Sequence, residues 1–393
     1  MKAIVVGAGI AGLVAARQLG LAGWDVEVLE KSRAPRPDGY MMDFFGPGVE
    51  ASERIGLYPR LAQAAYRIQS ADYVDAEGRT TCSIDYLRFS KLAGGKVLSL
   101  LRPDIEAAAL AALTDVPAGR VRVRYGARLV HAHTNGDGAH VLVEDGLRQD
   151  MHADAIIGAD GIHSEVRAAV FGPEEDYLRP LGMRAAAFIV TEPALNARFR
   201  GRLILTDTPN RMAGLYGIRQ DEVAAFLVYR DAASPGKAGE TARQRLRSEF
   251  DGLGDAVDRL MDLCPGHPYD DTVAQVVMPR WHTDRAVLVG DACGAVSLLA
   301  GQGGSLAIAA AALLGDILGQ VTKPSGIGEA LARFERQWRP VVESAQKSGR
   351  RTAATFLPRN NMQLLLRRWV IRATRLPGVD RWVAHQILRS IAK

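Results

Sequence analysis

The chain begins with a short apolar run, Lys2–Val6, that leads into the glycine turn Gly7-x-Gly9-x-x-Gly12. The first glycine permits a tight turn, the second lets the backbone approach a pyrophosphate, and the third lets a helix pack closely on a strand. A helix is expected from Ile10 to about Ala22, and its N-terminus would offer free N–H groups and a partial positive charge to a phosphate. This pattern predicts the first strand–turn–helix unit of a parallel, helix-covered sheet.

An acidic residue completes this pattern. The next expected strand is Asp25–Leu29, and Glu30 stands at its end. A carboxylate at this point accepts hydrogen bonds from both hydroxyls of a ribose and repels a 2′-phosphate. The glycine turn and Glu30 together predict a site for an adenine dinucleotide, but they do not distinguish FAD from NAD. A glycine-rich turn that binds no ligand is the alternative.

Two later strands also end in turns that carry an aspartate. Ala155–Gly158 leads into Ala159-Asp160-Gly161, and Arg285–Val289 leads into Gly290-Asp291. The loop Gly301-Gln302-Gly303-Gly304 follows, and then an alanine-rich helix expected at Ser305–Leu318. Each of these turns alone could be an ordinary connection between a strand and a loop.

In this order and spacing, the three turns resemble those of the FAD-dependent aromatic hydroxylases of the para-hydroxybenzoate hydroxylase class, the group A flavin monooxygenases. The resemblance covers nearly the whole chain and is weakest after about residue 340. The strings Ala51-x-Glu53-Arg54-x-Gly56-Leu57 and Leu101-Arg102-Pro103 are also similar to that family. Met41–Gly46 and Ser297–Gly303 look most like its tetracycline-modifying and polyketide-tailoring members. Cys293-Gly294 departs from the alanine and histidine of many relatives, and the proline that usually follows is absent, which leaves the shape of that loop open.

The resemblance implies a role in FAD binding for each turn. The carboxylate of Asp291 is implied to hold the ribityl chain, and Asp160 and Gly161 to lie near the pyrophosphate and to take part in nicotinamide-cofactor binding. Arg102 is implied to reach the phosphate region, with a surface salt bridge as the alternative. Backbone N–H groups of residues 301–304 would face the pyrimidine side of the isoalloxazine, where they can stabilise negative charge. The implied cofactor-binding residues are Gly7, Gly9, Ile10, Ala11, Gly12, Glu30, Lys31, Arg102, Asp160, Gly161, Gly290, Asp291, Gly301, Gln302, Gly303 and Gly304.

The resemblance also implies a reaction. NADPH or NADH reduces the flavin and leaves, O2 adds to the flavin C4a, and the distal oxygen of this C4a-hydroperoxyflavin passes to an electron-rich carbon of an aromatic or polyketide-like small molecule. No second glycine motif of this kind occurs, so a separate nicotinamide domain is not expected. The sequence identifies no catalytic base, and Asp43, His163 and Tyr216 are each interpreted as structural. The pocket is expected from residues 40–48, 82–100 and 185–230, with Phe188, Tyr216 and Phe226 as candidate substrate contacts.

Three other functions fit part of this pattern. A flavin-dependent halogenase would share the dinucleotide site, but its Trp-x-Trp-x-Ile-Pro signature is absent from the chain. A flavin reductase or dehydrogenase that inserts no oxygen remains compatible with the residues, as does a non-catalytic flavin-binding module. A product that gains one oxygen atom would separate the monooxygenase from both.

The elements expected along the chain predict an α/β protein with two interleaved domains. A Rossmann-like FAD-binding domain of the GR2 type is expected from residues 1–71, 98–176 and 278–330. A β-sheet substrate-binding domain is expected from residues 72–97 and 177–277, and C-terminal helices from residues 331–393. The other expected elements are strands within residues 72–88 and 185–230, a helix from Pro103 to about Leu113, a hairpin at Asn135–Gly138 and one helix at Ala242–Leu263.

The cysteines and histidines limit the other possibilities. Cys82, Cys264 and Cys293 are scattered without a CxxC pair, and the eight histidines follow no ligand spacing. Neither a disulfide framework nor a metal site is therefore expected. Cys293 could in principle link a flavin covalently, but a small buried residue beside the cofactor is the favoured interpretation.

Basic residues concentrate at the C-terminus, where residues 350–393 carry ten Lys and Arg and a single acid, Asp380. Val379, Val383, Ile387 and Ile391 recur every four positions, as on one face of a helix. We expect this helix to dock on the body of the protein with its arginines in water, rather than on a membrane or a nucleic acid. No apolar run reaches the length of about 18 residues that a membrane span needs, and no signal peptide precedes the first strand. A cytoplasmic monomer or weak dimer is therefore expected.

Overall fold

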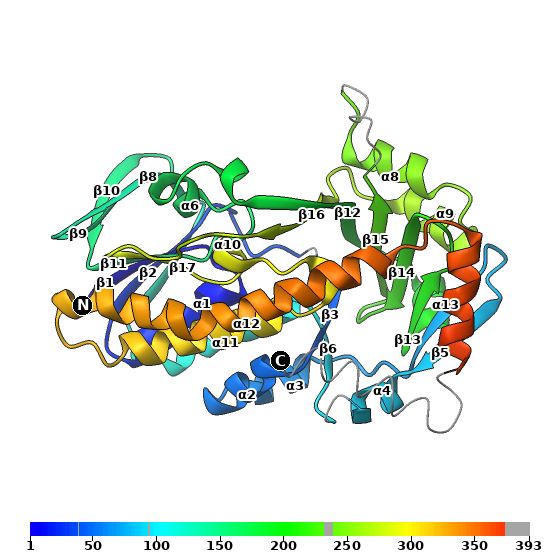
Figure 1. The fold of residues 1–393 in the computed structure, drawn as a ribbon, viewed down its shortest axis with the longest axis horizontal. Coiled ribbons are helices and arrows are strands. Elements are labelled where there is room, and N and C mark those ends of the chain that lie inside the picture. The colour runs from blue at the N-terminus through cyan, green and yellow to red at the C-terminus, as the bar shows by residue number, and fades with distance from the viewer. Residues whose placement is uncertain (38, 93–94, 232–238, 374–393) are drawn as a thin grey trace.

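Two large β-sheets lie side by side in the molecule, and long helices connect them (Figure 1). The computed structural model describes residues 1–37, 39–92, 95–231 and 239–373. The predicted helix face of Val379, Val383, Ile387 and Ile391 lies outside these residues. The predicted fold class is confirmed: a parallel Rossmann-like sheet, further sheets and helices toward the C-terminus.

The first large sheet has five parallel strands and lies on the left of Figure 1. Its strands, in spatial order, are β17 (Ala286–Leu288), β11 (Ala155–Gly158), β1 (Lys2–Val6), β2 (Asp25–Glu30) and β7 (Val121–Tyr125). The inner strands are runs of buried aliphatic residues, because parallel strands are covered on both faces. The carboxyl ends of parallel strands meet at one edge of a sheet. The turns after β1, β11 and β17 therefore come together there.

Helix α1 (Ile10–Leu21) packs on β1 and β2, and the alanine-rich helix α11 (Gly303–Leu318) packs on α1. Glycine permits this close approach, because a Cβ at Gly315 would lie only 2.3 Å from the Cβ of Gln18. The remaining helices on this part are α2 (Pro47–Arg54), α3 (Tyr58–Ala64), α5 (Arg102–Ala111) and α12 (Ile327–Phe356). This close packing fixes where the N-termini of α1 and α11 point.

A small three-stranded antiparallel sheet and the short helix α6 (Glu165–Val170) complete this part of the molecule. The strands are β8 (Arg128–Asn135), β9 (Gly138–Glu144) and β10 (Arg148–Ala153). The predicted hairpin at Asn135–Gly138 is confirmed, and the Asn135 side chain accepts hydrogen bonds from the N–H groups of Asp137 and Gly138. This is the local turn chemistry that asparagine supplies.

The second large sheet has seven strands and lies on the right of Figure 1. Its strands, in spatial order, are β16 (Tyr269–Val276), β12 (Leu178–Thr191), β15 (Glu222–Arg230), β14 (Arg211–Gly217), β13 (Arg202–Thr206), β4 (Ser70–Val74) and β5 (Thr80–Asp85). Only β13 and β4 pair in parallel. The sheet thus combines residues 70–85 with residues 178–276, while the division of the chain into domains stays a prediction.

The outer face of the seven-stranded sheet is covered by α7 (Pro193–Phe199), α8 (Ala242–Phe250) and α9 (Asp255–Leu263). The prediction of one helix at Ala242–Leu263 is wrong, because the chain leaves the helical conformation between α8 and α9. Gly252 and Gly254 there have φ values of +71° and +107°, which only glycine adopts without strain.

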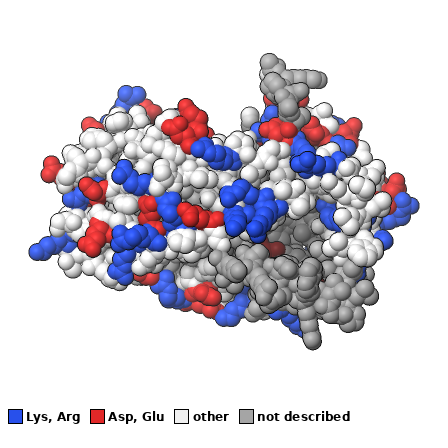
Figure 2. Space-filling view, in the orientation of Figure 1, with Lys and Arg blue, Asp and Glu red and all other residues white. Residues whose placement is uncertain are grey.

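Connecting elements join the two large sheets. The ribbon of β3 (Met41–Phe44) and β6 (Leu98–Leu101) lies between them, and α4 (Tyr86–Leu92) follows β5, so the end of the range predicted as strand is helical. The long helix α12 runs from the first sheet toward the second, where α13 (Asn361–Ala373) packs on β5 (Figure 1). Figure 2 shows acidic and basic residues intermixed over the region of α12.

The short helical segments that remain are α10 (Asp291–Gly294) and the single turns Ala112–Asp115, Glu174–Asp176, Leu298–Ala300 and Pro324–Gly326. Across the part of the chain that the structure describes, no helix is both long enough and apolar enough to cross a lipid bilayer.

Candidate active site

The glycine turn after β1 is built by close packing. Gly7 has a φ of +102°, and a Cβ there would lie 2.5 Å from the carbonyl oxygen of Ala159 in the neighbouring turn. A Cβ at Gly12 would lie 1.9 Å from the carbonyl oxygen of Gly7. A Cβ at Gly9, in contrast, would meet only the ends of two side chains, Glu106 and Arg102, at 3.6 and 3.9 Å. The backbone at Gly9 therefore faces an open groove.

Helix α1 begins at this turn without a side-chain cap, so the N–H groups of its first turn have no side-chain acceptor. Ile10 and Ala11, both predicted to bind the cofactor, form that first turn. Such uncapped N–H groups and the helix dipole together favour an anion at this point. The geometry fits a diphosphate that passes over Gly9.

The Glu30 carboxylate lies directly beneath the glycine turn. It accepts hydrogen bonds from the N–H of Ala8 and from the N–H of Ser32, both at 2.9 Å. Burial raises the pKa of Glu30, but the backbone donors of Ser32 and Ala8, the Ser32 side chain and the charge of Arg36 together hold the pKa below its usual range. Each carboxylate oxygen has further lone pairs, so the anion can hold the turn and still accept hydrogen bonds from a ribose.

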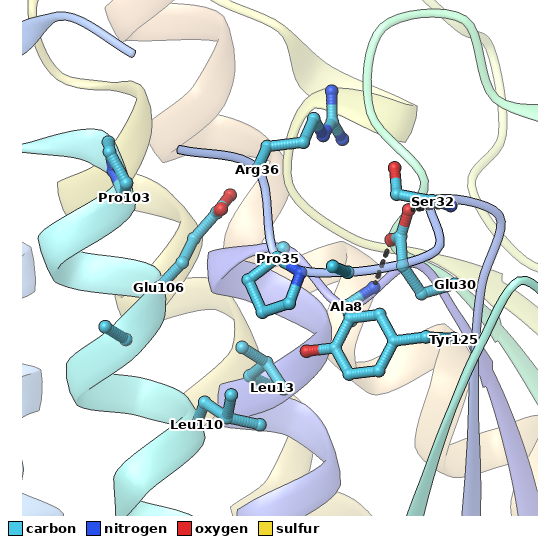
Figure 3. Close-up of a pocket in the computed structure, with 13 residues that line it drawn as sticks. Ala8, Leu13, Glu30, Ser32, Pro35, Arg36, Pro103, Glu106, Leu110 and Tyr125 are labelled. Atoms are coloured by element: carbon cyan, nitrogen blue, oxygen red, sulfur yellow. Dashed lines mark hydrogen bonds between the residues drawn. The ribbon is translucent and has the colours of Figure 1, made fainter. Parts of the chain in front are cut away.

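A cavity of about 500 Å³ lies beside Glu30 (Figure 3). Apolar side chains of Leu13, Pro35, Leu110 and Tyr125 form one part of its wall. The charged groups of Glu30, Arg36 and Glu106 form the other part. A wall that is flat and apolar on one side and polar on the other matches an adenosine.

Two further cavities continue this one into a single groove. The middle cavity shares Gly9, Glu30 and Arg36 with the first, and it shares Arg102, Asp160 and Gly161 with a large cleft of about 1560 Å³. Lys31 also lines the middle cavity and the cleft, with its Nζ 3.7 Å from Glu165. The turns after β1, β11 and β17 thus border one continuous groove, as the parallel sheet requires.

The turn at Asp160 is held by its own side chain. One carboxylate oxygen accepts from the Ser164 hydroxyl at 2.5 Å, and the other accepts from the N–H of Val166 at 3.0 Å. Burial raises the pKa of Asp160, while these hydrogen bonds oppose the rise. The carboxylate therefore shapes the turn into α6, and Gly161, with a φ of +81°, presents backbone to the groove.

Asp291 lies at the inner end of the groove, on the turn after β17. Its side chain faces the cleft, and Gly290 before it has a φ of +66°. The surrounding protein raises the pKa of the Asp291 carboxyl, and the charge of Arg102 opposes that rise. An acceptor at this depth can bind hydroxyl groups of a chain that runs along the groove.

The loop before α11 also borders the cleft. Gly301 and Gly303 line it, whereas Gly304 packs beneath, where a Cβ would lie 2.6 Å from the sulfur of Met42. Gln302 precedes α11, and no side chain caps that helix, so its first N–H groups have no side-chain acceptor. Ser305 fixes the start of α11 by donating to the carbonyl of Phe45 at 2.6 Å. Two uncapped helix N-termini therefore face the same groove.

Arg102 extends between the middle cavity and the cleft. Its Nη2 lies 3.0 Å from Oε1 of Glu106, one helical turn along α5. The salt bridge left open by the sequence thus exists, but it lies inside the groove and not on the outer surface.

Aromatic side chains form the cleft wall that faces the seven-stranded sheet. The ring centroids of Tyr40 and Phe226 are 5.3 Å apart, and those of Tyr40 and Tyr269 are 6.5 Å apart. Burial raises the pKa of the Tyr40 hydroxyl to about 12, so this phenol is neutral at physiological pH. Tyr269 was missed by sequence reasoning, because nothing local distinguishes one tyrosine at the start of an edge strand.

The three predicted substrate contacts lie in different places. Phe226 is half-buried and does not itself line the cleft, but its ring contacts Tyr40, which does. Tyr216 is buried, and its hydroxyl accepts a hydrogen bond from the N–H of Met41, so the group is already engaged. Phe188 is fully buried among residues of α8 and α9 on the outer face of the sheet. The structure therefore does not place Phe188 at the cleft, because its side chain points to the opposite side of the sheet.

The other titratable residues singled out by the sequence have structural partners. Asp43 accepts hydrogen bonds from the hydroxyls of Tyr86 and Ser99. His163 bridges Glu174 and Asp271, with both distances at 3.0 Å. Cys293 is buried, and burial raises the pKa of its thiol, which disfavours the reactive thiolate. Among the described residues, no group of three or more His, Cys, Asp or Glu side chains is arranged to hold a metal ion.

Comparison with known proteins gives a consistent result. Residues 1–348 match a family described as FAD binding domain. An uncharacterized protein of Mycobacterium tuberculosis is 32% identical over 358 residues, which cover 88% of this chain and 92% of that protein. A flavin-dependent monooxygenase of an unknown prokaryotic organism is 27% identical, and the match covers 96% of this chain and 98% of the relative. The crystal structure of the tetracycline destructase Tet(55) superposes with a TM-score of 0.78 at 25% identity, covering 98% of this chain and 97% of the other.

Proposed function

Since the chain belongs to the FAD binding domain family, we propose that it transfers one oxygen atom from O2 to an aromatic or polyketide-like small molecule, with NADPH or NADH as electron donor. The cofactor and the reaction class follow from the family: the protein is an FAD-dependent monooxygenase. The substrate and the roles of individual residues are the proposed part.

One observation carries the proposal: a single groove passes three nucleotide-binding turns and opens against an aromatic wall. The residues present fit FAD. Gly9 leaves the backbone open where a diphosphate would lie, and a Cβ at that position would face into the groove. The uncapped N-termini of α1 and α11 offer N–H groups at two places along its length.

When bound, FAD accepts a hydride equivalent from the nicotinamide cofactor and activates O2 for transfer. The chain's own residues would hold and orient it. Glu30 accepts from the adenosine ribose, Arg102 and the N-terminus of α1 bind the diphosphate, and Asp291 accepts from the ribityl hydroxyls. The N–H groups near Gly301 and Gly303 stabilise negative charge on the isoalloxazine, at about 3 kcal/mol for each preorganised donor.

The aromatic wall favours a flat, multi-ring substrate. Tyr40, Tyr269 and Val273 line the cleft, and the ring of Phe226 packs behind Tyr40. These side chains exclude water around the reacting atoms, which limits unproductive loss of the activated oxygen. One similar solved structure is a tetracycline destructase, so tetracyclines are the first multi-ring compounds to assay.

The test is reduction of the purified flavoprotein by NADPH without oxygen, followed by oxygen together with a panel of phenols and tetracyclines. A product heavier by one oxygen atom, formed in proportion to NADPH consumed, is the expected result. Reoxidation that yields only hydrogen peroxide with every compound would contradict oxygen transfer. It would favour a flavin reductase or dehydrogenase instead.

A matched pair of variants tests the location of the substrate. Phe226→Leu removes the ring that packs on Tyr40 of the cleft wall and should lower kcat/KM about threefold to tenfold, the usual contribution of one aromatic pair. Phe188→Leu removes the same ring from the outer face of the same sheet. This variant should lower the melting temperature and leave kcat/KM unchanged, and the reverse pattern would place the substrate elsewhere.

A further inference from the structure

The ion pair between Arg102 and Glu106 lies across the groove that would hold the FAD diphosphate. Both side chains come from the first two turns of α5, and their charged ends converge at 3.0 Å. The closest atoms to a Cβ built on Gly9 are Oε1 of Glu106 and Nη2 of Arg102. The pair therefore lies directly over the glycine that leaves the backbone open to a phosphate.

One carboxylate oxygen of Glu106 lacks a hydrogen-bond donor in this position. Its Oε1 is buried, and no donor in the described part of the chain forms a hydrogen bond to it, because the contact with Arg102 lacks hydrogen-bond geometry. The side chain is 12% exposed and points into the cavity beside Glu30, where Figure 3 shows its carboxylate between Pro103 and Arg36. A buried carboxylate without a donor is costly unless a cation stays beside it.

Three charged groups act on Glu106 besides its burial. Burial raises its pKa, Arg102 and Arg36 lower it, and Glu30 across the cavity raises it, so that the pKa lies above its usual range. Tyr125 faces the same cavity, and burial raises its pKa further from the physiological range. Arg102 is thus the larger of the two cationic influences that favour the charged form of Glu106.

A diphosphate would compete with Glu106 for Arg102. The incoming group is itself an anion, so it attracts the guanidinium and repels the carboxylate. Once Arg102 contacts the diphosphate, the main cation beside Glu106 is lost and negative charge is added over Gly9. Both changes favour the neutral form of a buried acid.

We propose that Glu106 couples FAD binding to the uptake of one proton: it holds Arg102 over Gly9 in the free protein, and it is protonated when Arg102 turns to the diphosphate. In this step the carboxylate of Glu106 gains a proton from solvent to become a carboxylic acid, and no bond of FAD is broken. The neutral acid can then donate a hydrogen bond to an oxygen of the bound nucleotide. The inference rests on the proposed FAD-binding roles of Arg102 and Gly9, and not on the identity of the substrate.

Titration of FAD into protein stripped of flavin, at pH values from 6 to 8.5, tests this coupling. The dissociation constant of the wild-type protein should rise with pH, by up to about tenfold for each pH unit when one proton is taken up. Glu106→Gln keeps the shape of the side chain but carries no charge. It should bind FAD more tightly than wild type at pH 8, by about tenfold, and show a correspondingly smaller dependence on pH.

Calorimetry in two buffers with different ionisation enthalpies counts the protons directly. The wild-type protein should take up more protons on binding FAD than Glu106→Gln does, by at most one proton for each FAD bound. Glu165→Gln is the matched control, because Glu165 lines the same groove but is paired with Lys31 and Arg128 at its rim. Glu165→Gln should change the dissociation constant for FAD but not the number of protons taken up when FAD binds.

A wild-type dissociation constant that does not vary with pH would overturn the proposal, as would a Glu106→Gln variant that keeps the wild-type slope. Asp160 and Asp291 also border the groove and have raised pKa values, so a slope that persists in the variant would be assigned to them. Failure of the stripped protein to bind FAD at all would instead contradict the proposed function. Circular dichroism of each variant verifies that the protein is folded.

Discussion

Glu30 combines two tasks in one carboxylate. It ties the glycine turn to β2 through the N–H groups of Ala8 and Ser32, and it would accept the ribose of FAD. Glu30→Gln removes the charge and introduces an amide where only acceptors are needed. We expect FAD binding to weaken about 10-fold to 100-fold, because hydrogen bonds to a charged acceptor contribute about 1.5–3 kcal/mol. Titration of the flavin-stripped protein with FAD measures this loss.

The same substitution should lower the stability of the flavin-free protein. A carboxylate whose pKa is depressed by folding stabilises the protein fully at pH values above its pKa in the unfolded chain, which is near 4.5 for Glu30. This stabilisation is lost as the pH falls through the lower pKa of the folded state. The difference in melting temperature between wild type and Glu30→Gln should therefore be constant near neutral pH and shrink below pH 4.5. Glu27→Gln, on the same strand but paired with Arg124, is the control and should bind FAD normally. Equal FAD affinity in both variants would contradict the role of Glu30.

Ion pairs with the buried carboxylate of Asp207 hold helix α13 against the seven-stranded sheet. Asp207 is fully buried, and its carboxylate accepts from Arg367 and Arg368 of α13 and from the hydroxyl of Thr81. Replacing both arginines by alanine leaves an uncompensated buried anion, which typically costs about 3–5 kcal/mol. The double variant should therefore unfold at lower denaturant concentration and become sensitive to proteases near α13.

Adding Asp207→Asn to that double variant should recover part of the lost stability, because no charge is then left buried. Arg372→Ala is the control, since Arg372 is exposed and donates to the carbonyl of Thr81 rather than to a carboxylate. A double variant as stable as this control would show that the ion pairs of Asp207 with Arg367 and Arg368 contribute nothing measurable to the free energy of unfolding.

His163 links the two large sheets at the mouth of the cleft. It follows the turn after β11 and lies between Glu174 on its own side and Asp271 of β16. The hydrogen bond to Asp271, with further support from Glu174, raises the pKa of His163 to about 9. A raised histidine pKa stabilises the fold fully below the unfolded value of 6.5, and the effect is lost as the pH rises through about 9.

His163→Gln should accordingly lower the melting temperature most at pH 6 and not at all by about pH 10. Salt should weaken the effect, because the side chain is half-exposed. His267→Gln, on the same cleft but outside this bridge, is the control. If His163→Gln lowers the melting temperature by the same amount at pH 6 and at pH 10, the ionic bridge is excluded.

Local patterns were sufficient for the elements that carry the nucleotide-binding turns. The run Lys2–Val6, the glycine turn and Glu30 follow one another along the chain, and each conformation depends on neighbours close in sequence. The hairpin at Asn135–Gly138 is local in the same way. The break between α8 and α9 was missed because apolar residues recur on both sides of Gly252 and Gly254, and the pattern of apolar residues does not reveal the positive φ values of these two glycines.

The sequence by itself determined the parallel nucleotide-binding sheet, the order of its three turns and the class of cofactor, because these depend on short-range chain geometry and on the edge where parallel strands end. The tertiary structure alone decided which aromatic residues meet the cleft. Phe188 and Phe226 belong to paired strands of one sheet, yet Phe188 packs under α8 and α9, whereas Phe226 packs on Tyr40 of the cleft wall. The tertiary structure also decided that Glu106 lies over Gly9. The sequence alone shows only that Glu106 follows Arg102 by four residues, the usual spacing of an ion pair on a helix. Alternation along a strand or helix divides side chains between faces, and only packing against distant segments decides what each face meets.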